Sequence, residues 1–180
     1  MFTYNKKLQY PVKIARPNPR LAAIIISRYG GPDGELGASL RYLSQRYSMP
    51  FDELKGLLTD IGTEELGHLE MIGAIVHQLT RNMKDDQYRD PAFAPYFVDH
   101  TAGVYPTAAS GFPWNAASMQ VKGDPIADLA EDMGADATTL HSQHFKNSSR
   151  FPREFVLFPD HDDILQYGLS GYQRSHGLNE

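Results

Sequence analysis

Glu65 and His68 are the residues whose types and spacing point most directly to chemistry. They lie within residues 51–81, where apolar side chains recur at every third or fourth position and predict a long helix. At 100° per residue, both fall within about 60° of Ile61 on the apolar face, whereas Glu70 falls on the opposite face. A buried carboxylate needs an ion pair or a metal, and Glu-x-x-His lets both side chains bind one metal ion or lets the glutamate bridge two. The alternative is a slightly rotated helix, with Glu65 at the surface and His68 as a hydrogen-bonded core histidine.

A second inward carboxylate is predicted at Glu35. Residues 19–47 have a helical apolar pattern that three glycines and a proline interrupt at positions 30–34, which predicts a break or kink. Arg28 and Arg46 share the face of Glu35, so a Glu–Arg ion pair is the alternative to a metal site. Two helices that each supply an inward glutamate, one of them with a histidine one turn later, match half of a di-metal carboxylate site in a four-helix bundle.

The other half of such a site has less support in the sequence. A third helix is predicted to begin near Asp124, which would be its cap, with Pro125 at the first helical position. The candidate ligand on its apolar face is Asp136. A fourth helix should supply a second Glu-x-x-His, but the sequence contains no other copy of this motif, and the available substitutes are His141, His144 and His161.

The segments between and outside these helices have little periodicity. Residues 1–18 contain prolines and predict an extended arm or edge strand. Residues 82–123 are rich in proline, glycine and aromatic side chains and predict a long crossover, of the kind that often has a functional or interface role. Beyond about residue 140 no helical or strand period is sustained, which predicts an irregular tail.

Composition limits the classes of function. The chain has 180 residues, of which 41% are apolar and 22% charged, as expected of one globular domain. A net charge of −5 argues against a nucleic-acid partner, which needs an excess of lysine and arginine. Cysteine is absent, so any metal must bind carboxylates and imidazoles, a donor set that favours manganese, iron or zinc. No secretory signal and no membrane-length apolar run is found, so we expect cytoplasmic synthesis without a signal peptide and no membrane partner.

Four stretches resemble the manganese catalase family, and within it the small spore coat proteins of the CotJC type. They are YNKKLQYPVKI, RYGGPDGELGASLRYLSQRY, GLLTDIGTEELGHLEMIGAIVHQLT and KGDPIADLAEDM. The resemblance runs from about residue 2 to residue 133 and implies an all-α, ferritin-like four-helix bundle around two manganese ions. It also implies that Glu35 is a ligand to one ion, that Glu65 bridges both, and that His68 is a terminal ligand.

The tail departs from this family. Where the family has a glutamate ligand followed by a basic run, the chain has Asp136, which is one methylene shorter, followed by ATTLHSQ. The fourth-helix histidine of the family has no clear counterpart. We therefore predict a manganese-catalase-like domain over residues 1–133 and an atypical tail over residues 134–180, produced either by a shifted reading frame or by genuine divergence.

Three functions are compatible with these residues. The first is a manganese catalase-like enzyme that dismutates hydrogen peroxide to water and dioxygen. The second is a structural spore coat component with an incomplete metal site, and the third is a ferritin-like di-iron oxidase or metal binder, because iron uses the same ligands. The resemblance further implies a homo-oligomer, a place in the spore coat and partner coat proteins. The aromatic crossover either wraps a neighbouring subunit or packs on its own bundle; its large side chains are Phe93, Tyr96, Phe97, Tyr105, Phe112 and Trp114.

Overall fold

Residues 5–90 and 103–143 are described by the computed structural model, with the side chains of Tyr88 and of residues 136–143 excepted. The four main helices are α1 (Pro19–Gly30), α2 (Glu35–Gln45), α3 (Asp52–Thr80) and α6 (Pro125–Gln143). A short helix α4 (Asp85–Tyr88) and two 3-10 turns (Arg46–Ser48 and Ala116–Ser118) complete the helical elements of this part. Predictions that fall on Phe93, Tyr96, Phe97, His144 and His161 lie outside the described residues.

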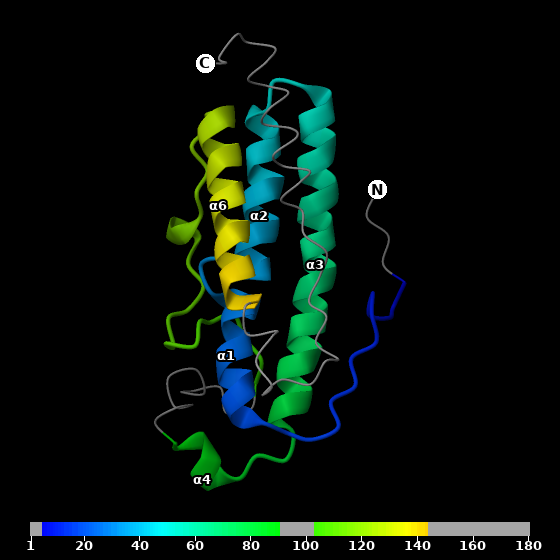
Figure 1. The fold of residues 1–180 in the computed structure, drawn as a ribbon, viewed down its shortest axis with the longest axis vertical. Helices are drawn as coiled ribbons and strands as arrows, with labels where there is room; N and C mark the ends of the chain where they lie inside the picture. Colours follow the sequence, from blue (N-terminus) through cyan, green and yellow to red (C-terminus); the bar gives the residue numbers. More distant parts are fainter. Residues whose placement is uncertain (1–4, 91–102, 144–180) are drawn as a thin grey trace.

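The main helices lie side by side along the long axis of the molecule (Figure 1). α1 and α2 follow one another in one direction, α3 returns beside both of them, and α6 runs beside α2. The predicted start of the third helix is confirmed, since the Asp124 carboxylate accepts hydrogen bonds from the amides of Ile126 at 3.0 Å and Ala127 at 2.9 Å. The helical character predicted from apolar periodicity is therefore confirmed.

The predicted break between residues 30 and 34 is confirmed and separates α1 from α2. The Gly31 amide donates to the Ser27 carbonyl at 2.9 Å, and the Gly34 amide donates to the Gly31 carbonyl at 3.0 Å. A Cβ atom at Gly34 would lie 2.7 Å from the Ser27 oxygen, so this turn requires glycine. The break makes Glu35 the first residue of α2, where the partial positive charge of the helix N-terminus meets its side chain.

The core consists of two apolar clusters at different heights of the bundle. One joins α1 to the second half of α3 and contains Ala22, Ile26, Ile72, Ile75, Val76 and Leu79. The other joins α2, the first half of α3 and α6, and contains Tyr42, Met49, Leu54, Leu58, Ile61 and Leu129. Each large apolar side chain buried here stabilises the fold by roughly 1.5–3 kcal/mol. Between Ile61 and Ile72, the inward face of α3 presents Glu65 and His68, so a polar layer separates the two clusters.

Buried hydrogen bonds fix α6 against α2. The Gln45 side chain donates from Nε2 to Asp132 Oδ1 at 3.1 Å, and both residues are fully buried. The buried Asp128 carboxylate accepts from the amides of Lys122 at 2.7 Å and Gly123 at 3.1 Å, which closes the turn before α6. α6 continues past residue 134, so the predicted domain boundary falls within this helix and stays a prediction.

None of the helices within residues 5–90 and 103–143 is both long enough and apolar enough to cross a bilayer.

Candidate metal centre

Three predicted ligands meet in the polar layer. Glu35, Glu65 and His68 each offer one ligand atom, and these atoms lie within 4.8 Å of one another. Glu65 is 4% exposed and His68 is 2% exposed. The alternative of a rotated helix with Glu65 at the surface is therefore wrong. The structure brings the two inward glutamates and the histidine together, while their binding of a metal stays a prediction.

The three side chains are already in polar contact with one another. His68 Nδ1 lies 2.7 Å from Glu65 Oε2, one helical turn earlier on α3. The carboxyl groups of Glu35 and Glu65 are hydrogen-bonded to each other across the α2–α3 interface. Two carboxyl groups share a hydrogen bond when one of them holds a proton, and the raised pKa of Glu35 favours a proton on this pair.

Burial governs the pKa values of this centre. The pKa of Glu35 is raised well above its ordinary value, first by burial and then by the hydrogen bond and the charge of Glu65; the charges of His68 and Arg28 oppose this rise. Burial lowers the pKa of His68, against the charges of Glu35 and Glu64. His68 is therefore a neutral imidazole near pH 7, the form that binds metals.

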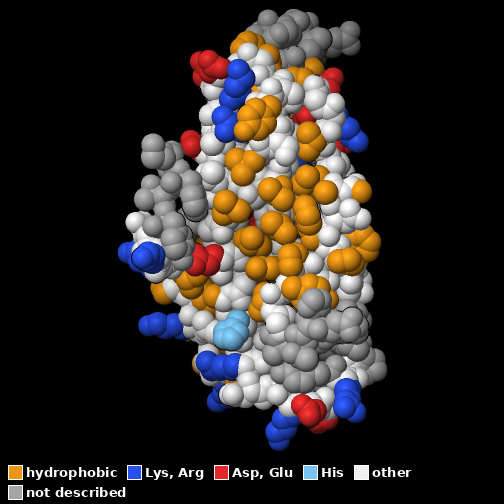
Figure 2. All heavy atoms as spheres, turned by 180° about the vertical axis from the view of Figure 1, so that it is seen from behind, with side chains coloured by type: hydrophobic (Ala, Val, Ile, Leu, Met, Phe, Trp, Pro, Cys, Tyr) orange, Lys and Arg blue, Asp and Glu red, His pale blue; other side chains and the backbone are white. Residues whose placement is uncertain are grey.

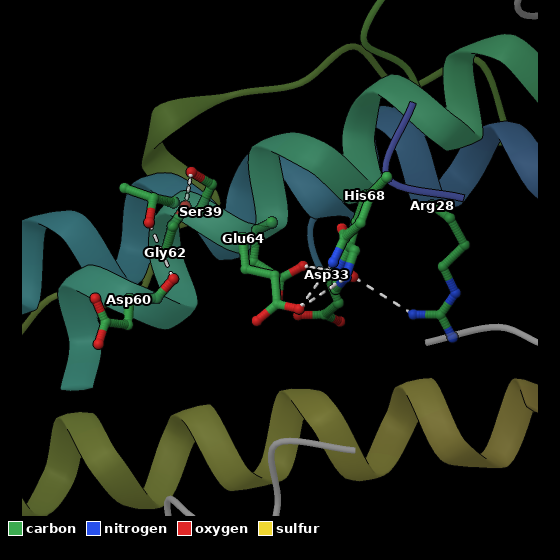
Figure 3. Close-up of polar contacts among 10 residues, drawn as sticks. Arg28, Asp33, Ser39, Asp60, Gly62, Glu64 and His68 are labelled. Carbon is green, nitrogen blue, oxygen red and sulfur yellow. Dashed lines mark hydrogen bonds and ion pairs between the residues drawn. The ribbon is translucent and has the colours of Figure 1, made fainter. Parts of the chain in front are cut away.

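The two arginines that offered ion-pair alternatives have different positions. Arg28 lies close enough for its charge to act on Glu35, and its Nη1 donates to the Asp33 carbonyl at 3.5 Å (Figure 3). The Arg46 guanidinium stacks 5.0 Å from the centroid of the Tyr47 ring. Glu35 thus has its main polar partner in Glu65, and Arg28 supplies a nearby positive charge.

No further carboxylate or imidazole joins this cluster within the described residues. Asp136 and His141 belong to α6, but their side chains lie outside the described part, so Asp136 stays a prediction. Asp132, one turn before Asp136, is hydrogen-bonded to Gln45 instead. His77 is exposed near the end of α3.

Sequence reasoning missed two polar neighbours of the centre. Glu64 Oε1 lies 3.9 Å from His68 Nε2, and the Gln9 side chain donates from Nε2 to the same Glu64 oxygen at 3.3 Å. Figure 3 shows Glu64 and His68 projecting from α3 into one cluster. The spacing of four residues between Glu64 and His68 could have revealed this pair, because such residues are neighbours on a helix. Gln9 carried no signal of this kind in the sequence.

The donor set fits a divalent transition metal. Two carboxyl groups and one neutral imidazole suit manganese or iron, and zinc also accepts these donors. The shared hydrogen bond between Glu35 and Glu65 marks a place where two carboxylates are held together against their mutual repulsion. A bound cation would favour the ionised form of both carboxylates and offset their charge.

Comparisons with known proteins agree with this chemistry. The manganese-containing catalase family matches residues 1–145. The chain is 52% identical over 136 residues to protein CotJC of Bacillus subtilis, a match that covers 76% of this chain and 71% of that protein. It is 34% identical over 140 residues to a probable manganese catalase of Clostridium acetobutylicum, a match that covers 76% of this chain but only 61% of that protein.

Solved structures give the same result for the fold. The crystal structure of KatB, a manganese catalase from Anabaena, superposes with a TM-score of 0.72 at 28% sequence identity, covering 98% of this chain and 76% of that chain. The all-α, ferritin-like fold class is confirmed, and manganese is the cofactor that the family indicates. The chain therefore belongs to the manganese-containing catalase family.

Proposed function

We propose that this chain binds manganese through Glu35, Glu65 and His68 and dismutates hydrogen peroxide to water and dioxygen. The observation that carries this proposal is the meeting of ligand atoms from half-buried Glu35 and buried Glu65 and His68 within 4.8 Å of one another. Membership of the manganese-containing catalase family supports it. Among the solved structures similar to this chain, KatB is named a manganese catalase.

Each residue has a defined part in this proposal. Glu65 would bridge two manganese ions, Glu35 and His68 would each bind one, and Asp136 of α6 would add a further ligand. Manganese, when bound, supplies the two-electron redox change and Lewis acidity. The carboxyl pair of Glu35 and Glu65 can hold or release a proton as charge at the centre changes. The apolar clusters on either side limit the access of water to this layer.

A structural spore coat component is the second candidate function. Its support is the name of CotJC, the protein from Bacillus subtilis that is 52% identical to this chain. Within the described part of the chain only three ligand residues come together, which is fewer than a di-metal site uses. In this case the protein would lie in the spore coat and contact other coat proteins without turning over peroxide.

A homo-oligomer is part of the proposal as well. Figure 2 shows a broad area of hydrophobic side chains on the face turned away from the viewer of Figure 1. Apolar areas of this kind on a protein surface commonly mark interfaces. Large apolar side chains that are exposed include Ile24, which is 57% exposed, and Tyr47, which is 80% exposed. Light scattering after gel filtration measures the subunit number directly.

Metal content and oxygen release test the catalytic proposal. Purified protein is analysed by inductively coupled plasma mass spectrometry, and oxygen release from peroxide is followed with an electrode. The test variant is His68→Gln; the matched control is His77→Gln, an exposed histidine on the same helix. Near two manganese per chain with oxygen release, lost in His68→Gln and kept in His77→Gln, is the expected result.

Other outcomes of this experiment decide between the candidates. Less than one metal ion per chain and no oxygen would refute catalysis and leave the structural role. Iron in place of manganese would favour a ferritin-like di-iron oxidase or metal binder. Re-sequencing the coding region separates the two explanations of the tail, because an intact frame excludes the shifted one.

A further inference from the structure

The two ring nitrogens of His68 face different carboxylates. Nδ1 lies 2.7 Å from Glu65 Oε2, on the side where the three candidate ligands meet. Nε2 lies 3.9 Å from Glu64 Oε1, on the other side of the ring. If Nδ1 binds a metal, Nε2 must hold the ring proton, because a neutral imidazole carries a single N–H.

We propose that Glu64 is a positioning residue, which fixes the orientation of the His68 ring by accepting the Nε2–H, and that Gln9 of the N-terminal arm holds Glu64 for this role. Metal-bound histidines almost always donate their second ring N–H to a carboxylate, a carbonyl or water, and this bond sets the tautomer and the ring angle. The effect of Glu64 on metal affinity rests on the proposed function, whereas its effect on the metal-free ring requires only that Glu65 donate to Nδ1, which leaves the ring N–H on Nε2.

The position of Glu64 on α3 supports this role. It lies one turn before His68, so the helix itself brings the two side chains together. The His68 side chain is 3% exposed and the Glu64 side chain is 35% exposed, so Glu64 joins a buried ring to the solvated surface. A hydrogen bond between them needs the oxygen to approach by less than about 1 Å, which the soft terminal torsion of a glutamate allows.

Gln9 restricts where the Glu64 carboxylate can go. Its Nε2 donates to Glu64 Oε1, the same oxygen that faces His68. Gly67, which directly precedes His68 on α3, leaves room for Gln9: a Cβ atom there would lie 3.1 Å from Gln9 Oε1. The glutamine side chain therefore lies directly against the turn of α3 that carries the pair.

The arm that carries Gln9 is fixed to α3 by several hydrogen bonds. The Gln78 side chain accepts from the Ile14 amide at 2.8 Å and donates to the Val12 carbonyl at 3.0 Å. Arg81 Nη2 donates to the Ile14 carbonyl at 2.8 Å. Figure 1 shows the arm running beside α3. This segment, predicted as an extended arm or edge strand, is therefore an arm that brings a distant residue to the metal centre.

Substitution of Glu64 tests the proposal with and without metal. Glu64→Ala removes the acceptor, Glu64→Gln keeps the size and one acceptor oxygen, and Glu53→Ala, an exposed glutamate in the first turn of α3, is the matched control. The first readout is the pair of ¹⁵N chemical shifts of the His68 ring in metal-free protein. We expect these shifts to change in Glu64→Ala, to change less in Glu64→Gln, and to stay at the wild-type values in Glu53→Ala.

The second readout is the affinity for manganese(II), measured by calorimetric titration. Loss of a partner of this kind typically lowers metal affinity about 10–100-fold. We expect that loss in Glu64→Ala, partial rescue in Glu64→Gln and a smaller loss in Gln9→Ala. Gln9→Ala changes an exposed arm side chain and so keeps the test available if Glu64→Ala does not fold.

Two results would overturn the proposal. Unchanged His68 ring shifts in metal-free Glu64→Ala would show that Glu64 does not orient the ring, whatever the metal does. An affinity equal to wild type in a variant whose ring shifts change would show that the orientation has no effect on binding. If the wild type binds no manganese, the proposed function fails, and the ring shifts alone decide the positioning role of Glu64.

Discussion

Replacement of Glu35 by glutamine should make the metal-free protein more stable than wild type and the manganese-loaded protein less stable than wild type. Glu35→Gln keeps the shape of the side chain and its hydrogen bond to Glu65 but removes an ionisable group. In the folded protein the pKa of Glu35 is raised above its ordinary value of 4.5, chiefly by burial. Its contribution to stability is therefore fully present below that ordinary value and is lost as the pH rises through the higher folded value. The variant does not lose this stability, because glutamine does not ionise.

The size of the effect follows from the burial of the carboxyl pair. A buried polar group without adequate compensation costs about 1–3 kcal/mol. Taking about 2 kcal/mol, and about 2–4 °C per kcal/mol for a chain of this length, the metal-free variant should melt about 4–8 °C above wild type at pH 8. With manganese at about 1,000 times its dissociation constant, wild type should gain about 4.1 kcal/mol, and the variant, with one ligand fewer, should gain less than half of that.

Thermal melts with chelator and with manganese, at several pH values above the ordinary pKa of Glu35, provide the measurement. Glu53→Gln, at an exposed position of α3, is the control for the loss of a negative charge. The order of the two melting temperatures should reverse between chelator and manganese, and the gap in chelator should widen as the pH rises. A variant less stable than wild type in chelator at pH 8, or one that keeps the full manganese shift, would refute the reasoning.

Three further predictions concern the centre and its supports. Manganese uptake should release protons, because the raised pKa of Glu35 favours its protonated form in the metal-free protein. The calorimetric enthalpy should therefore vary with the ionisation enthalpy of the buffer, and an enthalpy independent of the buffer would contradict this. Gly30→Ala should destabilise by about 1–3 kcal/mol, because its Cβ would lie 2.3 Å from Pro106 Cα. Gly56→Ala should stabilise the protein by about 0.5–1 kcal/mol, because Gly56 is exposed in α3 and a Cβ atom there would meet no atom within 4 Å. Equal changes in the free energy of unfolding for both variants, measured in urea, would show that the close approach of Pro106 to Gly30 is wrong. Gln45→Leu should cost about 1–3 kcal/mol in the same assay because buried Asp132 loses this amide partner, and a cost below about 0.5 kcal/mol would show that the bond does not fix α6.

Features that depend on neighbouring residues could be predicted from the sequence. The long helix over Asp52–Thr80 follows from its apolar period, and the start of α6 follows from Asp124 and Pro125 at the cap and the first helical position. The inward positions of Glu65 and His68 follow from the same period, because a regular helix fixes the angle between any two of its residues. The break before Glu35 follows from glycine and proline, whose backbone preferences are local.

The tertiary structure alone decided which of these side chains meet. Glu35 reaches Glu65 only because α2 and α3 pack at one height and one rotation. Gly62 of α3 helps to set this register, because a Cβ atom there would lie only 2.9 Å from Leu43 Cγ of α2. Gln9 reaches Glu64 across 55 positions of sequence, and Gln45 reaches Asp132 across 87. The physical reason is that a helical period gives the angle of a residue on its own helix, whereas its height against a neighbouring helix depends on how the side chains of both interlock.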